Sequence, residues 1–200
     1  MSGKRPFILG LTGSIGMGKS TTAQMFRDEG LPVIDSDAVV HDLYRGEAVP
    51  LIEHAFPGTT VDGVVDRGRL SAYLSRHPGD FKLLETIVHP LVRKREVASI
   101  VAAGEAGADI VVLDVPLLFE SGALARVDKV VVVTCDPEIQ RARVLSRPGM
   151  TEEKFRLILS RQTPDVEKRR RADFIIDTGL GLDHARAEVR RIVAVLRSGG

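Results

Sequence analysis

The chain has 200 residues, of which 44% are hydrophobic and only 4% aromatic, and its formal net charge is +1. This length and apolar content predict one compact domain with insertions around an aliphatic core. A near-neutral charge gives no general attraction to nucleic acid or to an anionic membrane surface. The single cysteine, Cys135, cannot form an internal disulfide, and no apolar run is long enough to span a membrane. We therefore expect a cytoplasmic protein without a nucleic-acid or membrane partner, with Cys135 in its core.

The first predicted element is a buried strand over residues 7–12, and a helix is predicted over residues 21–29. The loop between them fits G-x-x-x-x-G-K-[ST], the phosphate-binding pattern of nucleoside triphosphate enzymes. A dinucleotide-binding loop is disfavoured because the pattern G-x-G-x-x-G is absent. The residues of the loop are Gly13, Ser14, Ile15, Gly16, Met17, Gly18, Lys19, Ser20 and Thr21.

A loop of this kind binds phosphate mainly through its backbone. Glycines allow successive N–H groups to turn inward, and the N-terminus of the following helix adds a positive potential. Lys19 is expected to reach the β- and γ-phosphates, and the Ser20 hydroxyl is expected to ligate Mg²⁺. The loop therefore predicts a nucleoside triphosphate bound together with Mg²⁺.

Two carboxylates, Asp35 and Asp37, come at and just after the end of the second predicted strand, residues 32–35, at the same edge of the sheet as the phosphate loop. Two interpretations stay open. In one, both carboxylates face the cleft, where one orders Mg²⁺-bound water and the other takes the proton of a hydroxyl acceptor. In the other, Asp37 only caps a helix over residues 38–44.

Residues 38–108 contain no convincing strand and several helical segments. Asp66 can cap a helix through Leu74, and Asp80 can cap a longer helix, which Pro90 is expected to kink or interrupt. An insertion after the second strand of an α/β sheet lies over the carboxyl ends of the strands, where ligands bind. We therefore expect this segment to bind the acceptor substrate.

Three further β-branched runs, residues 110–114, 129–134 and 174–177, bring the predicted strands to about five. They are almost unalternated, which is typical of strands buried on both faces of a parallel sheet. Helical patterns between them predict an α/β fold. One helix is expected to begin at Pro137 and another to cover residues 183–197.

Three more residues have two possible interpretations each. Asp114 ends the third strand and Glu120 follows it closely, and each is either a site residue or an ordinary surface or capping residue. His89, alone in a helical segment, is more typical of a structural histidine.

Seven motifs follow one another along the chain: residues 11–21, 33–37, 89–92, 115–120, 136–140 with Arg143 and Arg147, Gln162, and residues 172–177. This ordered set resembles the dephospho-CoA kinase family over nearly the whole chain, and it is far more specific than the phosphate loop alone. Two positions depart from the family pattern: Thr178 stands where asparagine is usual, and Ile158 stands where the lid helix often has arginine.

The resemblance implies a P-loop kinase with a three-layer α/β/α core, formed by residues 1–37 and 109–200, and a small lid near residues 146–162. Residues 38–108 would form a helical domain that binds the acceptor. Such enzymes transfer the γ-phosphoryl group of Mg·ATP to the ribose 3′-hydroxyl of dephospho-CoA, giving CoA and ADP in the last step of coenzyme A biosynthesis. A monomer or a weak homo-oligomer is expected.

The resemblance also implies roles for individual residues. Asp37 would be the base, Arg143 and Arg147 would neutralise the transferring phosphate, and Asp35 would contact Mg²⁺, possibly through water. The acceptor side would comprise Thr12, His89, Arg93, Leu117, Leu118 and Glu120.

Two alternatives to this interpretation differ in what the chain would need. A P-loop kinase for another small acceptor, such as a nucleoside monophosphate or shikimate, would share the core and differ in the insertion. A GTPase-type switch would need [NT]-K-x-D and D-x-x-G motifs, which the segments 134–137 and 114–117 do not supply.

Overall fold

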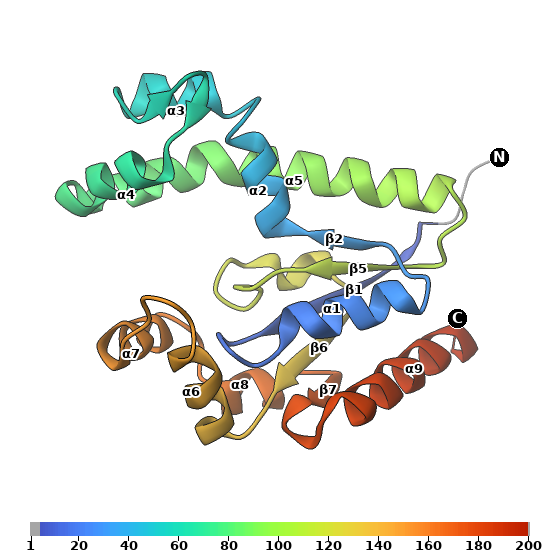
Figure 1. Cartoon of the computed structure of the whole chain (residues 1–200). Coiled ribbons are helices and arrows are strands. Elements are labelled where there is room, and N and C mark those ends of the chain that lie inside the picture. Colours follow the sequence, from blue (N-terminus) through green and yellow to red (C-terminus); the bar gives the residue numbers. More distant parts are fainter. Residues whose placement is uncertain (1–4, 200) are drawn as a thin grey trace. The chain divides into compact units, whose positions relative to one another are not determined.

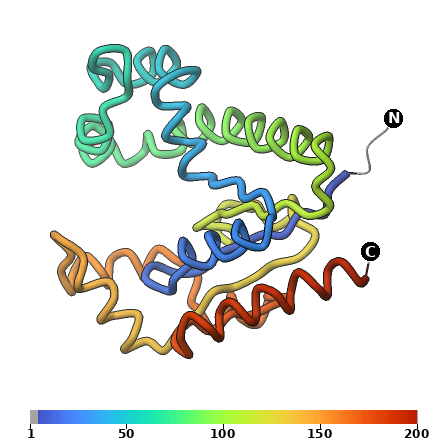
Figure 2. Tube along the Cα trace, turned by 45° about the vertical axis from the view of Figure 1, so that its right-hand side comes forward, coloured from blue at the N-terminus to red at the C-terminus, as the bar shows by residue number. Residues whose placement is uncertain are grey.

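The computed structural model describes residues 5–199, and the chain forms two compact units (Figures 1 and 2). The first unit contains the described part of Met1–Ile34 together with that of Ala102–Gly200. The second unit contains Asp35–Val101. Across residues 5–199, no helix combines the length and the apolar character needed to cross a membrane.

The first unit is built on a five-stranded sheet with the order β2-β5-β1-β6-β7. The central strand β1 pairs in parallel with β5 and β6, and β6 pairs in parallel with β7. This arrangement confirms the predicted α/β fold, and the five strands match the five predicted apolar runs. The strands are β1 (Phe7–Gly13), β2 (Val33–Asp35), β5 (Ile110–Asp114), β6 (Lys129–Thr134) and β7 (Phe174–Asp177).

Two helices, α1 (Lys19–Asp28) and α9 (Leu182–Ser198), pack against the sheet and against each other, and both views show them side by side. Their apolar residues, such as Phe26 and Ile192, join the strand residues in one buried cluster. Burial of aliphatic surface in this cluster is the main stabilising contribution. The other helical segments of this unit are α6 (Pro137–Leu145), α7 (Glu152–Ser160), α8 (Asp165–Arg170) and the short 3₁₀ turns Ala123–Arg126 and Thr178–Leu180.

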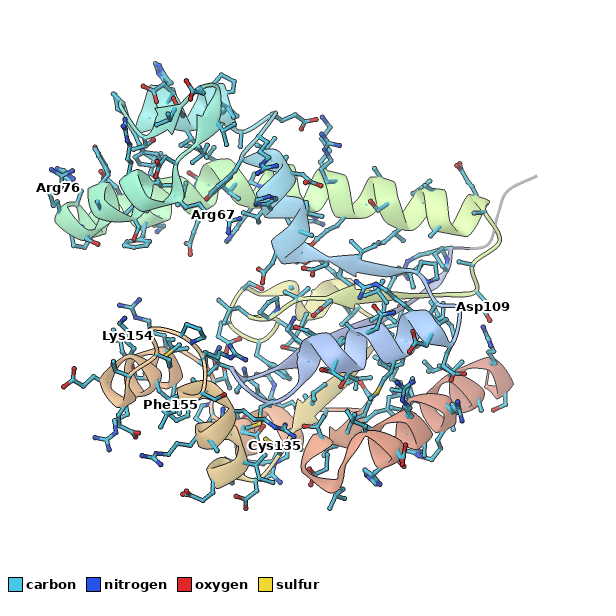
Figure 3. The ribbon with its side chains drawn as sticks, in the orientation of Figure 1. Arg67, Arg76, Asp109, Cys135, Lys154 and Phe155 are labelled. Atoms are coloured by element: carbon cyan, nitrogen blue, oxygen red, sulfur yellow. The ribbon has the colours of Figure 1, made fainter. Side chains whose placement is uncertain are left out.

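Cys135 follows β6 and is buried, as predicted (Figure 3). Its Sγ lies 3.4 Å from the Sδ of Met17, and its backbone N–H donates to the same sulfur at 3.1 Å. Burial raises the pKa of the Cys135 thiol and outweighs the opposing effect of the Arg143 charge. The thiol is therefore a neutral packing group beneath the phosphate loop, as expected for a buried cysteine.

The second unit has its own apolar core, which includes Phe56, Leu70 and Val88. A two-stranded hairpin in this unit was missed by the sequence analysis, because strands of two residues leave no periodic signal. The elements are α2 (Ser36–Leu43), α3 (Val49–Ala55), β3 (Thr60–Val61), β4 (Val64–Val65), α4 (Arg67–Arg76), the 3₁₀ turn Pro78–Asp80 and α5 (Phe81–Glu105), of which Phe81–Val101 falls in this unit.

Of the two outcomes expected at Pro90, a kink or an interruption, the interruption is wrong, because α5 continues through this residue. Apolar residues on both sides of Pro90, including Val88 and Leu91, belong to the core of the second unit. Their packing offsets the backbone hydrogen bond that a proline cannot donate. The predicted cap is confirmed for α4, where the Asp66 carboxylate accepts the N–H of Arg69 at 2.9 Å.

Candidate active site

The phosphate loop joins β1 to α1, and its glycines have conformations that other residues rarely adopt. Gly16 has φ 78° and Gly18 has φ 92°, both in the left-handed region. A Cβ on Gly13 would lie 2.8 Å from the carbonyl oxygen of Val133, too close for any side chain. The backbone therefore follows a path that only glycine permits at these three positions.

Lys19 begins α1, and its Nζ lies 2.6 Å from Oδ1 of Asp114 at the end of β5. Parallel pairing of β1 with β5 brings these two residues together across 95 positions of sequence. The Asp114 side chain is only 3% exposed and that of Lys19 is 16% exposed. The surface interpretation of Asp114 is therefore wrong, and the carboxylate belongs to the phosphate-loop region.

A pocket of about 290 Å³ lies beside the loop. It contains Arg143 and Arg147 together with Gly16 and Gly18, so the structure unites two predicted arginines with the predicted phosphate loop. Its remaining lining residues are mainly small or apolar and come from α1, the turn after β7 and α9: Thr21, Thr22, Met25, Thr178, Leu182 and Ala185. Ser20 is exposed at the N-terminus of α1.

The Arg143 guanidinium is held by Thr178. Its Nη1 donates to Thr178 Oγ1 at 2.8 Å, and its Nη2 donates to the Thr178 carbonyl at 3.0 Å. The Thr178 hydroxyl in turn donates to the Met17 carbonyl at 2.8 Å. Sequence analysis marked Thr178 only as a departure from a family pattern, since nothing local in the sequence indicates these contacts.

Two glutamines fix Ile15 in the phosphate loop. The Ile15 N–H donates to Gln162 Oε1 at 3.2 Å, and Gln140 Nε2 donates to the Ile15 carbonyl at 2.7 Å. Gln140 lies on α6 and Gln162 follows α7, so the predicted lid region is connected directly to the loop.

Several residues predicted on the acceptor side are tied into the first unit. Thr12 is fully buried, and its hydroxyl donates to the Pro116 carbonyl at 3.1 Å. Leu118 is also fully buried, whereas Leu117 is 44% exposed. Of these three residues, only Leu117 presents a large accessible side chain.

Glu120 connects the loop after β5 to the segment after α7. Its Oε1 accepts the N–H of Thr163 at 2.6 Å and lies 3.3 Å from Nζ of Lys168, whose side chain is fully buried. Burial raises the pKa of Glu120, but the Thr163 N–H and the Lys168 charge outweigh it and the net pKa is lowered. Glu120 is therefore a charged structural link as well as a predicted acceptor contact.

In the second unit, Asp37 lies in the first turn of α2. The cap of this helix is Asp35, whose Oδ1 accepts the N–H groups of Asp37 and Ala38 at 2.9 and 3.1 Å. The interpretation of Asp37 as the cap is therefore wrong, because Asp35 already occupies that role. Ser36 donates to the buried Glu96 of α5 at 2.5 Å, which fixes the start of the helix.

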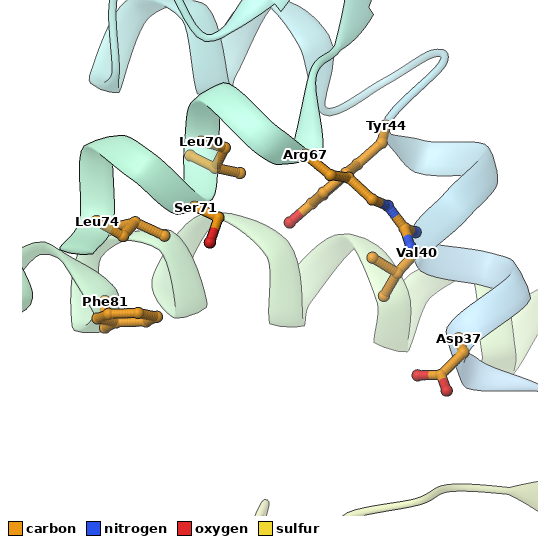
Figure 4. Close-up of a pocket in the computed structure, with 8 residues that line it drawn as sticks. All are labelled: Asp37, Val40, Tyr44, Arg67, Leu70, Ser71, Leu74 and Phe81. Atoms are coloured by element: carbon orange, nitrogen blue, oxygen red, sulfur yellow. The ribbon is translucent and has the colours of Figure 1, made fainter. Parts of the chain in front are cut away.

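Asp37 lines a pocket of about 440 Å³ that lies wholly within the second unit (Figure 4). Asp37 is at one end, Leu74 and Phe81 are at the other, and Arg67 lies between them. The Arg67 guanidinium is 5.5 Å from the ring centroid of Tyr44. Burial raises the Tyr44 pKa more than Arg67 lowers it, so the phenol stays neutral. Val40, Leu70 and Ser71 complete the lining.

Sequence analysis missed all of the pocket residues except Asp37, because they come from three helices with no shared motif. Of the missed residues on those three helices, Arg67 was the one that the sequence could best have indicated. It is a basic residue in the first turn of a helix, where acidic residues are usual. His89 and Arg93, one turn apart on α5, are exposed and do not line this pocket.

A parallel sheet, a glycine loop with its lysine leading into α1, and a pocket lined by two arginines beside that loop define the class of P-loop kinases. The sequence profile described as dephospho-CoA kinase matches residues 7–183. The chain therefore belongs to the dephospho-CoA kinase family.

Individual relatives agree with this assignment. The dephospho-CoA kinase of Agrobacterium fabrum is 61% identical over 189 residues, covering 94% of this chain and 97% of that protein. The dephospho-CoA kinase of Mesorhizobium japonicum is 62% identical over 190 residues, covering 95% and 96%.

Solved structures are similar over the same extent. The crystal structure of TT1252 from Thermus thermophilus superposes with a TM-score of 0.86 at 33% identity, covering 96% of this chain and 98% of that one. Dephospho-CoA kinase from Campylobacter jejuni gives a TM-score of 0.67 at 22% identity with the same coverage, 96% and 98%. At this lower identity the likeness concerns the fold alone.

Proposed function

We propose that the protein phosphorylates the ribose 3′-hydroxyl of dephospho-CoA with Mg·ATP, giving CoA and ADP in the last step of coenzyme A biosynthesis. The observation that carries the proposal is the complete phosphate loop with Lys19 on an intact P-loop kinase core. Two relatives that match 94% and 95% of the chain, both dephospho-CoA kinases by name, support the choice of acceptor.

The ATP side of the reaction belongs to the first unit. Backbone N–H groups of the loop between Gly13 and Thr21 bind the phosphates, other than that of Ile15, which donates to Gln162. Lys19 leaves Asp114 to reach the β- and γ-phosphates. Arg143 and Arg147 contribute positive charge from the neighbouring pocket. In phosphoryl transfer most of the catalytic effect comes from such positioned cations, since charge develops on the transferring oxygens.

The residues present fit a magnesium ion, because hard oxygen donors suit this cation. The Ser20 hydroxyl is exposed at the N-terminus of α1, and the Asp114 carboxylate lies against the neighbouring Lys19. Ser20 would hold the ion together with the nucleotide, with Asp35 contributing through water by its second carboxylate oxygen. When bound, Mg²⁺ would neutralise charge on the phosphate oxygens.

The acceptor side belongs to the second unit, residues 38–108 in the sequence-based division. Asp37 takes the proton of the 3′-hydroxyl while the oxygen of that hydroxyl attacks the γ-phosphorus. The bond from this phosphorus to the bridging oxygen of ADP breaks. In dephospho-CoA a diphosphate lies between a ribose and a flexible arm. Arg67 lies between Asp37 and the apolar end of the pocket, a position that suits this diphosphate. Leu74 and Phe81 then contact that arm.

The remaining assignments are part of the same proposal. His89, Arg93, Leu117 and Glu120 provide further acceptor contacts, and residues 146–162 act as a lid over the nucleotide. The enzyme works in the cytoplasm as a monomer or weak homo-oligomer, where a single thiol such as Cys135 stays reduced.

The test is ADP release from Mg·ATP with dephospho-CoA, compared with AMP, UMP, shikimate and no acceptor. Rapid turnover with dephospho-CoA alone, and CoA as the product, is the expected result. Turnover with another acceptor would keep the kinase core but overturn the assignment of the second unit. Hydrolysis of ATP that is indifferent to every acceptor would overturn the kinase proposal itself.

A further inference from the structure

The phosphate loop is held at Met17 by a residue that lies 161 positions away along the chain, Thr178. The Thr178 hydroxyl donates to the Met17 carbonyl at 2.8 Å and accepts from Arg143 Nη1 at 2.8 Å. We propose that Thr178 is a positioning residue for the nucleotide, whose hydroxyl holds the phosphate loop and Arg143 in the arrangement that binds the triphosphate. This inference rests on the nucleotide site proposed above.

The chemistry of a hydroxyl matches this double role. A threonine hydroxyl has one proton to donate and lone pairs with which to accept. Here the proton is directed to Met17, with the Thr134 carbonyl as a longer contact at 3.3 Å, and a lone pair takes the Arg143 N–H. Thr178 is only 9% exposed, so water does not readily replace these bonds.

Thr178 orients the Arg143 guanidinium, which keeps further N–H donors and its positive charge for a ligand. A guanidinium has five N–H donors in a rigid fork, and two of them go to Thr178. Within residues 5–199, Arg143 forms no ion pair with a carboxylate. A half-buried cation without an anionic partner, in the wall of the pocket beside Gly16 and Gly18, suits phosphate.

Thr178 also packs directly against the loop. A Cβ on Gly18 would lie 3.1 Å from both Cγ2 and Oγ1 of Thr178. The side chain therefore fills the space under the loop as well as bonding to it. Valine keeps this shape without the hydroxyl, and serine keeps the hydroxyl without the methyl group, so the two substitutions separate packing from hydrogen bonding.

The experiment compares the wild type with Thr178→Val and Thr178→Ser. Titration calorimetry gives the Kd for Mg·ATP, and steady-state assays give kcat and both KM values. We expect Thr178→Val to weaken Mg·ATP binding about tenfold or more, because a bond to a charged group is lost. Its KM for dephospho-CoA should stay within about twofold, and Thr178→Ser should retain most of the affinity.

Thr59→Val is the matched control. Thr59 is also a buried threonine, 2% exposed, whose hydroxyl donates to a backbone carbonyl, that of Phe56, at 2.7 Å, but it lies in the second unit. This variant is expected to lose stability to a similar degree without any change in the affinity for Mg·ATP. A general effect of losing a buried hydroxyl is thereby separated from a role in positioning the nucleotide.

Wild-type affinity for Mg·ATP in Thr178→Val would overturn the inference, as would a change confined to the KM for dephospho-CoA. If Thr178→Val does not fold, Arg143→Lys replaces it, because lysine keeps the charge and loses the two-pronged contact. About a tenfold loss of affinity is again expected, and unchanged affinity would overturn the inference.

Lys19→Ala is measured alongside, and it distinguishes an error in the role of Thr178 from an error in the proposed nucleotide site. If Lys19→Ala is impaired but the Thr178 and Arg143 variants are not, only the role of Thr178 is wrong. If Lys19→Ala behaves as the wild type, the proposed nucleotide site is itself wrong, and the inference fails with it.

Discussion

The two pockets of this protein are built by different means. In the first unit, the walls beside the phosphate loop come from segments far apart in the chain, and buried polar contacts to backbone atoms hold them, such as that of Thr178 with Met17 across 161 positions. In the second unit, every lining residue falls between Asp37 and Phe81, on helices that share one apolar core. The nucleotide pocket is therefore assembled by the tertiary fold of the backbone, whereas the pocket of the second unit is formed by side chains of neighbouring helices. Substitutions should affect ATP parameters in the first pocket and acceptor parameters in the second.

The largest effect is expected from Lys19→Ala, which removes the cation proposed to reach the β- and γ-phosphates. Turnover should fall about 10²- to 10³-fold, the usual loss when one such electrostatic contact is removed. Steady-state assays measure this at a temperature below the melting transition, since the ion pair between Lys19 and Asp114 is also lost. Lys129→Ala is the control because Lys129 also forms an ion pair, 2.7 Å from Asp173. Near-normal turnover in Lys19→Ala would show that the loop does not act on the phosphates.

Asp37→Asn tests the second pocket and should lower kcat about a hundredfold if Asp37 is the base. The free energy of unfolding should change by less than about 0.5 kcal/mol, because Asp35 caps the helix. Asp42→Asn, an exposed carboxylate on the same helix, is the matched control. A loss of stability without a loss of kcat would remove Asp37 from the mechanism.

Arg67→Ala sharpens the division between the pockets. We expect the KM for dephospho-CoA to rise about tenfold, as for loss of a charge-assisted contact, with the KM for ATP within about twofold. Arg69→Ala, an exposed arginine on the same helix, should leave both constants unchanged. An increase confined to the KM for ATP would contradict the separation of roles.

The smallest effect concerns the pH dependence of stability. The folded-state pKa of Glu120 is lowered, because bonds from Thr163 and Lys168 outweigh the effect of burial. A lowered folded pKa adds stability above the unfolded value of 4.5, and this stability is lost as the pH falls through the folded pKa. Urea unfolding from pH 6 to pH 3 should therefore show a shallower pH dependence for Glu120→Gln than for the wild type. Identical slopes for the two proteins would mean that folding does not lower the pKa of the Glu120 carboxyl.

Much of the first unit could be predicted because its signals are local. The five apolar runs became five strands, and the helix expected to begin at Pro137 begins there, with Asp136 as its cap. The second unit was less predictable in detail. Its hairpin is too short for a periodic pattern, and the continuity of α5 through Pro90 depends on packing in the apolar core.

The sequence by itself determined the phosphate loop, the α/β order and the family motifs, because glycine conformation, capping and apolar periodicity act over a few residues. Only the tertiary structure decided which distant groups meet: Lys19 with Asp114 across 95 positions, and Met17 and Arg143 with Thr178. It also showed that Asp35 rather than Asp37 caps α2. The physical reason is that these contacts depend on strand order and on the packing of helices against the sheet, which bring together residues that no local pattern relates.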